Sequence, residues 1–234
     1  MPQKRCYVAP PPGVEPSKLG GLLVVVEGPD SSGRSTQTRL LSEWLEQKGF
    51  AVSQVGLKRS ALVSAELENA MMGNVLSPRT MSLFYATDFY DQLENSIVPA
   101  LRAGSIVLAD RYIFTLIARD VVRGANPEWT EMLYSRALVP DAVYYLTVSP
   151  RSLVERTLQS HGCLDYWESG MDIGHSRDWF ESFVWYQRRI REEFRRLEQR
   201  FRFETINANR SVRTTQNDLR KRIEGVLQQA LAKL

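Results

Sequence analysis

Glycines, a basic residue and hydroxyl residues follow one another near the start of the chain at the spacing of a phosphate-binding loop. Residues 28–35 read G-P-D-S-S-G-R-S, and Thr36 comes next. The glycines let backbone N–H groups turn inward around phosphate oxygens, and the positive end of a following helix adds to the attraction. The Ser35 hydroxyl can ligate Mg²⁺. We therefore expect phosphates to bind at Gly28, Ser31, Ser32, Gly33, Arg34, Ser35 and Thr36.

Arg34 stands where such loops normally carry Lys. Its planar guanidinium keeps the positive charge but cannot occupy the place of a compact ammonium, so the two residues are not equivalent. Three interpretations are open: an active site with altered geometry, a site that binds without turnover, and a chance match in a Gly-Ser turn. We favour the first and expect Arg34 to contact the bound phosphates.

An acid and an arginine follow a second apolar run. Asp110 comes directly after the run 106–109, and Arg111 is its neighbour. At the end of a buried strand, Asp110 can hold Mg²⁺ through water, and its alternative role is to cap the next helix. Arg111 can bind the phosphate of an acceptor and steady a transferred phosphoryl group, because charge neutralisation and alignment carry most of phosphoryl-transfer catalysis.

The elements that would position these residues alternate between strand and helix patterns. The run 22–26, L-L-V-V-V, is the clearest buried strand, and further strands are expected over 51–55, 105–109, 142–146 and 203–206. Helices are expected over 35–48, 64–72, 81–103, 128–138, 149–160, 183–201 and 211–234. This order predicts an α/β fold with the three layers of a P-loop NTPase. A parallel sheet of about five strands would have helices on both faces and ligands at the carboxyl ends of its strands.

The chain divides into a proline-rich start and one domain. Residues 1–20 are rich in proline and lack the apolar run of a secretory signal, so we interpret them as a flexible tail. Residues 21–234 are expected to form one domain. Within it, residues 161–177 break all periodicity and have the length of a lid over an active site.

Composition narrows the function classes. A net charge of +3 is too weak an excess to indicate nucleic-acid or membrane binding, and the apolar stretch 22–26 is far too short to span a bilayer. The arginines of residues 188–202 are interleaved with glutamates, which indicates a solvated, ion-paired helix face. The two cysteines, Cys6 and Cys163, indicate no disulfide framework. We expect a cytoplasmic protein with no nucleic-acid partner and no membrane partner.

The phosphate loop and three downstream segments resemble the thymidylate kinase family. Residues 27–37, E-G-P-D-S-S-G-R-S-T-Q, are similar to the family's usual E-G-x-D-x-x-G-K-[ST]-T-Q. Residues 97–112 hold I-V-P-A-L, a glycine and D-R-Y in the family's order, and residues 140–146 are similar to its P-D…Y-L. The resemblance runs from about residue 22 to the C-terminus and is weakest over 56–80 and 160–180.

The resemblance implies a kinase that transfers the γ-phosphoryl group of ATP to dTMP, giving dTDP, with Mg²⁺ as cofactor. It implies that Ser35 and Asp110 hold the metal, that Arg34 lies on the donor phosphates and that Arg111 lies on the acceptor phosphate. It further assigns Asp30 to the sugar hydroxyl of the acceptor. Because family members are commonly homodimers, it also implies a homodimer.

The acceptor residues follow from looser parts of the resemblance. Residues 85–91, Y-A-T-D-F-Y-D, are similar to the family's F-A-A-D-R-x-Q, so Tyr85 matches the aromatic that stacks on thymine. Phe89 stands in place of a phosphate-binding Arg of the family, and we expect it at the substrate site. Arg59 matches an Arg after the second strand, although Lys58 and Arg59 could equally be solvated loop charges.

Two alternatives remain beside dTMP phosphorylation. The changed Arg34, the changed Phe89 and the acidic residues of the stretch 161–177 are compatible with a nucleotide-binding protein without turnover. The enzyme could also act on another nucleotide, a nucleoside or a polyphosphate. His161, Cys163, Asp165 and His175 match no closed zinc pattern, so a metal site of these residues is disfavoured.

Overall fold

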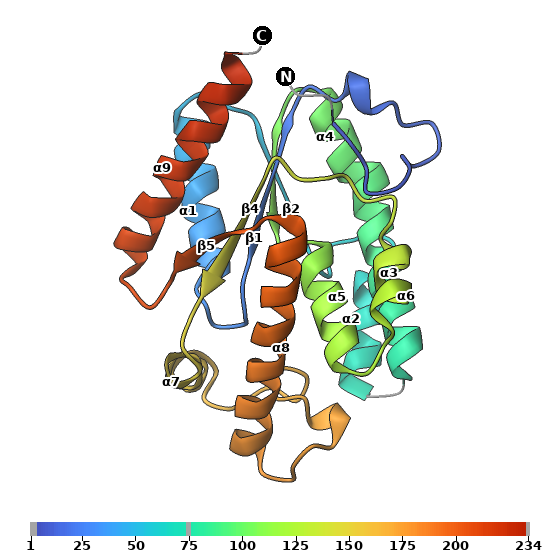
Figure 1. Ribbon diagram of the computed structural model, residues 1–234, viewed down its shortest axis with the longest axis vertical. Coiled ribbons are helices and arrows are strands. Elements are labelled where there is room, and N and C mark those ends of the chain that lie inside the picture. Colours follow the sequence, from blue (N-terminus) through green and yellow to red (C-terminus); the bar gives the residue numbers. More distant parts are fainter. Residues whose placement is uncertain (1–3, 74–75, 233–234) are drawn as a thin grey trace.

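A parallel sheet of five strands forms the centre of the molecule (Figure 1). The computed structural model describes residues 4–73 and 76–232. The strand order is β2-β3-β1-β4-β5, and every neighbouring pair runs parallel. The strands are β1 (Leu22–Glu27), β2 (Val52–Gly56), β3 (Ile106–Asp110), β4 (Ala142–Thr147) and β5 (Glu204–Asn207). The predicted fold class is confirmed.

Helices cover both faces of the sheet (Figure 1). They are α1 (Arg34–Gln47), α2 (Ser64–Gly73), α3 (Pro78–Gln92), α4 (Val98–Arg102), α5 (Ile113–Val122), α6 (Pro127–Leu133), α7 (Pro150–His161), α8 (Trp179–Phe201) and α9 (Val212–Leu231). Residues of α1 and α9 pack on one face, and residues of α3, α4, α5 and α8 pack on the other. Of the terminal helix expected over 211–234, the last two residues lie outside the described part.

The central strand β1 is apolar up to its last residue, Glu27, because it is buried on both faces of the sheet. All six of its residues are buried. Leu23 and Val25 belong to the core beneath α3, α5 and α8, whereas Val24 and Val26 belong to the core beneath α1 and α9. A strand buried on both faces has no polar side, so the period-two alternation of a half-exposed strand is absent.

The long helix expected over 81–103 is divided into three parts. A helix begins after Ser77, whose hydroxyl accepts a hydrogen bond from the Thr80 N–H, and it ends at Gln92. A wide π-helical turn, Leu93–Ile97, then leads into α4, which contains Pro99. Because a proline ring clashes with the carbonyl four residues earlier, the widened turn before Pro99 is a local accommodation of that ring.

Helix α5 is an element that the sequence patterns did not predict. Residues 113–118 of this helix are all buried. Residues 119–122 are half-buried and include Arg119 and Asp120. The apolar run 113–118 is short, and periodicity alone does not distinguish such a run in a helix from a buried strand. Conversely, the helix expected over 128–138 ends at Leu133; residues 134–137 form turns and a bend, and Leu138 pairs with Cys6 in an isolated β-bridge.

The proline-rich start of the chain is packed over its described part, contrary to the expected flexible tail. Lys4 is buried and ion-paired with Asp141. The Tyr7 N–H donates to the Ala137 carbonyl at 3.1 Å, and its ring meets Phe201 edge-on. Proline content indicated a lack of regular structure, but it carried no information about this long-range pairing. Residues 1–3 of the predicted tail lie outside the described part.

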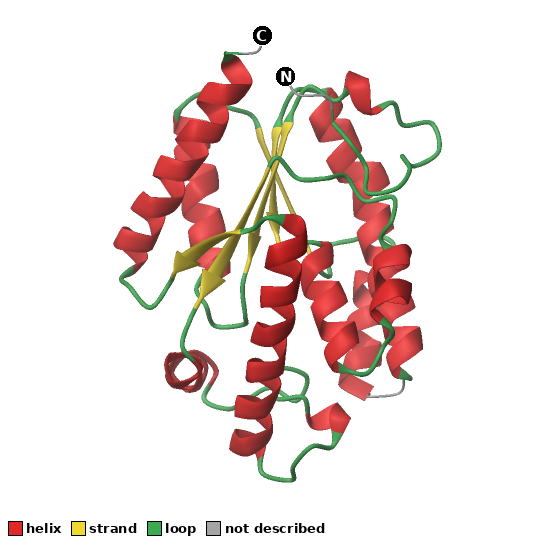
Figure 2. Cartoon of the chain, viewed as in Figure 1, coloured by secondary structure: helices red, strands yellow, loops and turns green. Residues whose placement is uncertain are grey.

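All strands of the sheet point their carboxyl ends toward the end of the molecule that holds α7 and the segment 162–178 (Figure 2). The phosphate loop follows β1, and Asp110 ends β3, so both reach this edge. None of the described helices is long and apolar enough to cross a membrane.

Candidate active site

The phosphate loop opens onto a groove of about 570 Å³. Ser35 and Thr36 are exposed on it, and Arg156 of α7 and Glu168 line its other side. Gly28 is required by close packing, since a Cβ atom there would lie 2.9 Å from the Ser32 hydroxyl oxygen and 3.1 Å from a β4 carbonyl oxygen. The loop is therefore tightly packed against β4 at Gly28 and open to the groove at Ser35 and Thr36.

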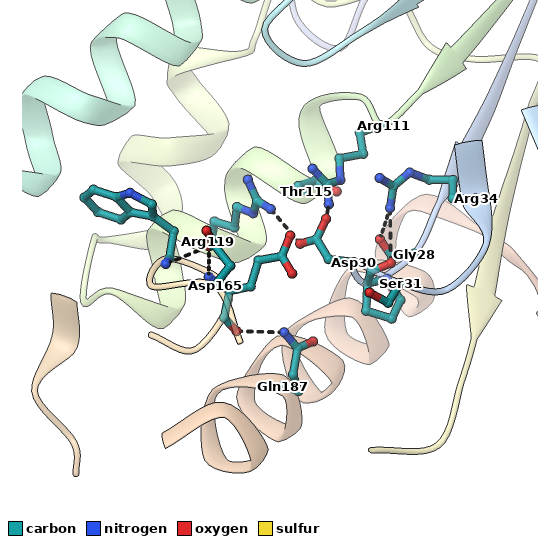
Figure 3. A network of polar contacts seen from close by, with 12 residues as sticks. Gly28, Asp30, Ser31, Arg34, Arg111, Thr115, Arg119, Asp165 and Gln187 are labelled. Atoms are coloured by element: carbon teal, nitrogen blue, oxygen red, sulfur yellow. Dashed lines mark hydrogen bonds and ion pairs between the residues drawn. The ribbon is translucent and has the colours of Figure 1, made fainter. Parts of the chain in front are cut away.

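Arg34 folds back onto its own loop, as Figure 3 shows. Its Nη1 donates to the Gly28 carbonyl at 2.5 Å and its Nε is ion-paired with Asp110. The side chain is 8% exposed. We expected Arg34 on the donor phosphates, and the structure has its guanidinium on a carboxylate at the edge of the groove. The phosphate role of Arg34 stays a prediction.

Asp110 is ion-paired with two arginines, Arg34 and Arg59, which come from different parts of the chain. Besides Arg34, the Nη2 of Arg59 lies 3.7 Å from its Oδ2. Arg59 comes from the loop after β2, and its side chain is 43% exposed. The structure therefore places Arg59 beside Asp110, and its expected contact with the substrate stays a prediction.

Asp30 lies between Arg111, which directly follows β3, and Arg119 of α5 (Figure 3). It is ion-paired with Arg111, and the Nη2 of Arg119 lies 2.9 Å from its other carboxylate oxygen. Burial, followed by the charge of Arg119, lowers the pKa of Arg111 to about 9. The Nε of Arg111 is buried and has no hydrogen-bond partner among the described residues. A guanidinium with an unused donor is suited to an anionic ligand.

Arg111 is held in an unusual backbone conformation. Its φ is +73°, and its N–H donates to the Val26 carbonyl at 3.0 Å. The next residue after Val26 is the buried Glu27. It accepts hydrogen bonds from the Tyr112 N–H at 2.9 Å and from the Thr115 hydroxyl at 2.5 Å. Burial raises the pKa of Glu27, and these hydrogen bonds oppose the rise. Glu27 thus anchors the start of α5 and, through Tyr112, the backbone directly after Arg111.

A second cavity, of about 120 Å³, lies beyond Arg119. This acceptor cavity is several times the roughly 10–15 Å³ that one water molecule needs. It is lined by Met71, Leu76, Pro78, Met81, Tyr85, Leu116, Arg119, Asp120, Arg123, Trp167 and Asp172. Tyr85, the expected base-stacking residue, is one of its walls. Apolar side chains and a few polar groups are the usual lining of a small-molecule site.

Phe89 does not line this cavity. It is 4% exposed and packs edge-on against Tyr90, Tyr112 and Tyr134 at centroid distances of 5.2 to 5.6 Å. The structure therefore does not support the substrate contact expected of Phe89. An aromatic ring in place of an arginine can be buried in the aromatic core, and this burial removes it from the site.

Two residues of the segment 161–177 are bound beside this cavity by Arg123, which directly follows α5. The Nε of Arg123 donates to Asp172 at 2.7 Å, and its Nη1 donates to the Tyr186 hydroxyl at 2.6 Å. Its Nη2 donates to the Trp167 carbonyl at 3.1 Å. Arg177, the arginine that the sequence places inside the lid, is exposed and lines neither cavity.

Arg119, Asp120 and Arg123 are site residues that sequence reasoning missed. All three lie on α5 or directly after it, in the helix that the sequence patterns did not predict. Glu27 was quoted only as part of the loop motif, although an acid at the end of a fully apolar strand is itself a signal for a buried anchoring role.

Asp120 gives the fold a specific pH dependence. Burial raises its pKa from 3.8 to about 6, although the Ser82 hydroxyl and the charges of Arg123 and Arg119 lower it in part. The folded protein therefore favours neutral Asp120: this contribution to stability is complete below about pH 4 and is lost as the pH rises through about 6.

We predict that Asp120→Asn changes this dependence. The free energy of unfolding of the variant, relative to that of the parent protein, should increase by roughly 2 to 3 kcal/mol between about pH 4 and pH 7. Urea unfolding of both proteins across that range measures it. A difference between the two proteins that stays constant with pH would contradict the buried-carboxylate account.

Comparisons with known proteins agree with this geometry. The sequence pattern of thymidylate kinases matches residues 26–219. A probable thymidylate kinase 2 of Saccharolobus solfataricus is 36% identical over 204 residues, which cover 87% of this chain and 95% of that protein. A probable thymidylate kinase of Thermococcus gammatolerans is 28% identical over 221 residues, covering 90% and 98%. A thymidylate kinase of an Exiguobacterium species is 32% identical over 171 residues, covering 68% and 78%.

Proposed function

The chain belongs to the thymidylate kinase family, and on that premise we propose that it transfers the γ-phosphoryl group of ATP to dTMP, giving ADP and dTDP. The observation that carries the proposal is the cluster of Asp30, Arg111 and Arg119 between two cavities. Asp30 lines the groove of the phosphate loop, and Arg119 lines the acceptor cavity. A phosphoryl group passing from one ligand to the other would cross this cluster.

The donor triphosphate binds in the groove. Backbone N–H groups of the loop surround its oxygens, and the Ser32 hydroxyl, buried and without a partner among the described residues, is a further group free to meet them. Ser35 and Asp110 would hold Mg²⁺, which would supply charge neutralisation at the phosphates. Asp110, which is ion-paired with Arg34, would hold the metal through water.

The acceptor binds on the other side of the cluster. Its phosphate lies against Arg111 and Arg119, whose charges align it with the donor and balance the charge of the transferred group. Asp30 turns to the sugar hydroxyl, and Tyr85 stacks on the base. The lid segment held by Arg123 excludes water, which would otherwise accept the phosphoryl group.

A panel of acceptors tests this function. The full chain is incubated with ATP and Mg²⁺ and with dTMP, dUMP, dCMP, dAMP, dGMP or thymidine, and both ADP and the phosphorylated acceptor are quantified by chromatography. We expect dTDP to form fastest. ATP binding by calorimetry without any phosphorylated acceptor would favour a protein that binds without turnover. A faster reaction with another acceptor would reassign the substrate.

We also propose, from the family resemblance, a homodimer in the cytoplasm. Sedimentation of the pure protein tests the assembly, and a single species at the 26.8 kDa of one chain would contradict it.

A further inference from the structure

One carboxylate oxygen in the acceptor cavity has no partner. The Oδ2 of Asp120 is buried and makes no hydrogen bond to any described residue. Asp120 lines the cavity together with Tyr85 and Leu116. A buried acceptor without a donor is costly to a fold, so its presence beside a ligand-sized cavity points to a donor on the ligand.

The other polar groups that line this cavity are already engaged with the protein. Arg123 bonds to Asp172, which uses both of its carboxylate oxygens on that arginine. The Trp167 indole N–H donates to the Met71 carbonyl at 3.2 Å, and the Tyr85 hydroxyl donates to the Met71 sulfur, also at 3.2 Å. The Oδ2 of Asp120 is thus an acceptor atom that none of these described groups uses.

Arg119 supplies the complementary donor. The structure shows one hydrogen bond from its guanidinium, from Nη2 to Asp30 at 2.9 Å. A guanidinium carries five N–H donors, so others are available toward the cavity that Arg119 also lines. An acceptor and a donor at consecutive residues of one helix therefore border the space next to Tyr85.

We propose that Asp120 determines which base the acceptor nucleotide carries, by accepting a hydrogen bond from the ring N–H at position 3 of thymine, while Arg119 donates to a carbonyl beside it. This inference rests on the proposed function. Thymine presents an N–H donor between two carbonyl acceptors along this edge, which matches an acceptor next to a donor. Cytosine has a bare ring nitrogen at position 3, which would face the carboxylate without a proton between them.

The apolar part of the cavity agrees with this orientation. Met71, Leu76, Met81 and Leu116 surround the polar pair, and they suit the remaining, methyl-bearing part of the ring. Phe89 is buried in the aromatic core and offers no competing polar contact. Asp30 and Arg111 on the far side of Arg119 leave the sugar and the phosphate outside the cavity.

The test compares dTMP with dTMP methylated at N3, which lacks the proposed donor. Steady-state kcat/KM is measured for both nucleotides with the parent protein and with Asp120→Ala, which makes room for the methyl group. The parent should prefer dTMP by about 100-fold or more, and Asp120→Ala should lower kcat/KM for dTMP by about 10- to 100-fold, mainly through KM. In this variant the preference for dTMP over the methylated nucleotide should fall to within a few-fold.

Asp120→Asn provides a second variant in case the alanine protein does not fold. An amide can donate a hydrogen bond to the bare nitrogen of cytosine, so the ratio of kcat/KM for dCMP to that for dTMP should rise by about tenfold. Glu94→Ala, which removes an exposed carboxylate of the π-helical turn, is the matched control and should change neither ratio.

Two failures are distinguishable. If the parent protein phosphorylates dTMP and Asp120→Ala keeps the same kcat/KM and the same discrimination against the methylated nucleotide, the role of Asp120 is refuted and the proposed function stands. If the parent transfers no phosphoryl group to dTMP, the proposed function itself fails, and this inference falls with it.

Discussion

Arg111→Ala is expected to lower kcat/KM for dTMP by about 1,000-fold or more, with the affinity for ATP changed less than about threefold. Arg111 is buried, paired with Asp30 and left with an unused Nε donor beside the phosphate loop. Its removal takes away the charge that aligns the acceptor phosphate and leaves Asp30 to repel it. Steady-state kinetics with dTMP, together with calorimetry for ATP, measure the two effects.

Arg111→Lys is the control that keeps the positive charge but loses the planar guanidinium. A lysine keeps one positive charge but cannot offer two parallel donors, so we expect it to recover only part of the lost rate. Because Arg111 has a left-handed backbone, the unfolding of both variants is measured alongside. Folded Arg111→Ala protein with the parent's kcat/KM would remove Arg111 from the acceptor site.

Arg34→Ala is expected to lower kcat by about 100- to 1,000-fold. The substitution would remove the positive charge that we propose for the donor phosphates, and among the described residues it leaves Asp110 with the more distant Arg59, at 3.7 Å, as its ion-pair partner. Arg34→Lys should stay within about tenfold of the parent, because Lys is the usual residue of this loop and reaches the phosphates as a point charge. Initial rates at saturating ATP and dTMP give kcat directly.

Arg39→Ala is the matched control for Arg34. It lies on the same helix, is exposed and pairs with Glu43 at 2.5 Å away from the groove, so its removal should leave kcat unchanged. Parent-like turnover by Arg34→Ala would mean that Arg34 only ties Asp110 to the loop carbonyls. The proposed contact of Arg34 with the donor phosphates would then be wrong.

The donor half of the site was accessible to prediction because its signals are local. Glycine spacing and a fully apolar strand lie within fifteen residues of one another, and Asp110 and Arg111 follow a second strand of the same kind. The sheet then brings both segments to one edge without further information. The fold class followed from the alternation of strands and helices for the same reason.

The acceptor half was mostly hidden because it depends on α5, whose short apolar run 113–118 does not distinguish a helix from a buried strand. Arg119, Asp120 and Arg123 lie on α5 or directly after it. The geometry of Arg34 was equally hidden, since it depends on a carboxylate 76 residues away. Sequence patterns of neighbouring residues do not predict ion pairs between residues that are so far apart in the chain.

The position of Asp30 between Arg111 and Arg119 has a consequence for turnover. In the absence of substrate, this carboxylate compensates two guanidinium groups that would otherwise repel each other. In the proposed reaction, the acceptor phosphate would therefore compete with Asp30 for these arginines, and Asp30 would replace the departing product. This exchange would weaken ground-state affinity for the acceptor and hasten dissociation of the product, which would favour repeated turnover over tight retention.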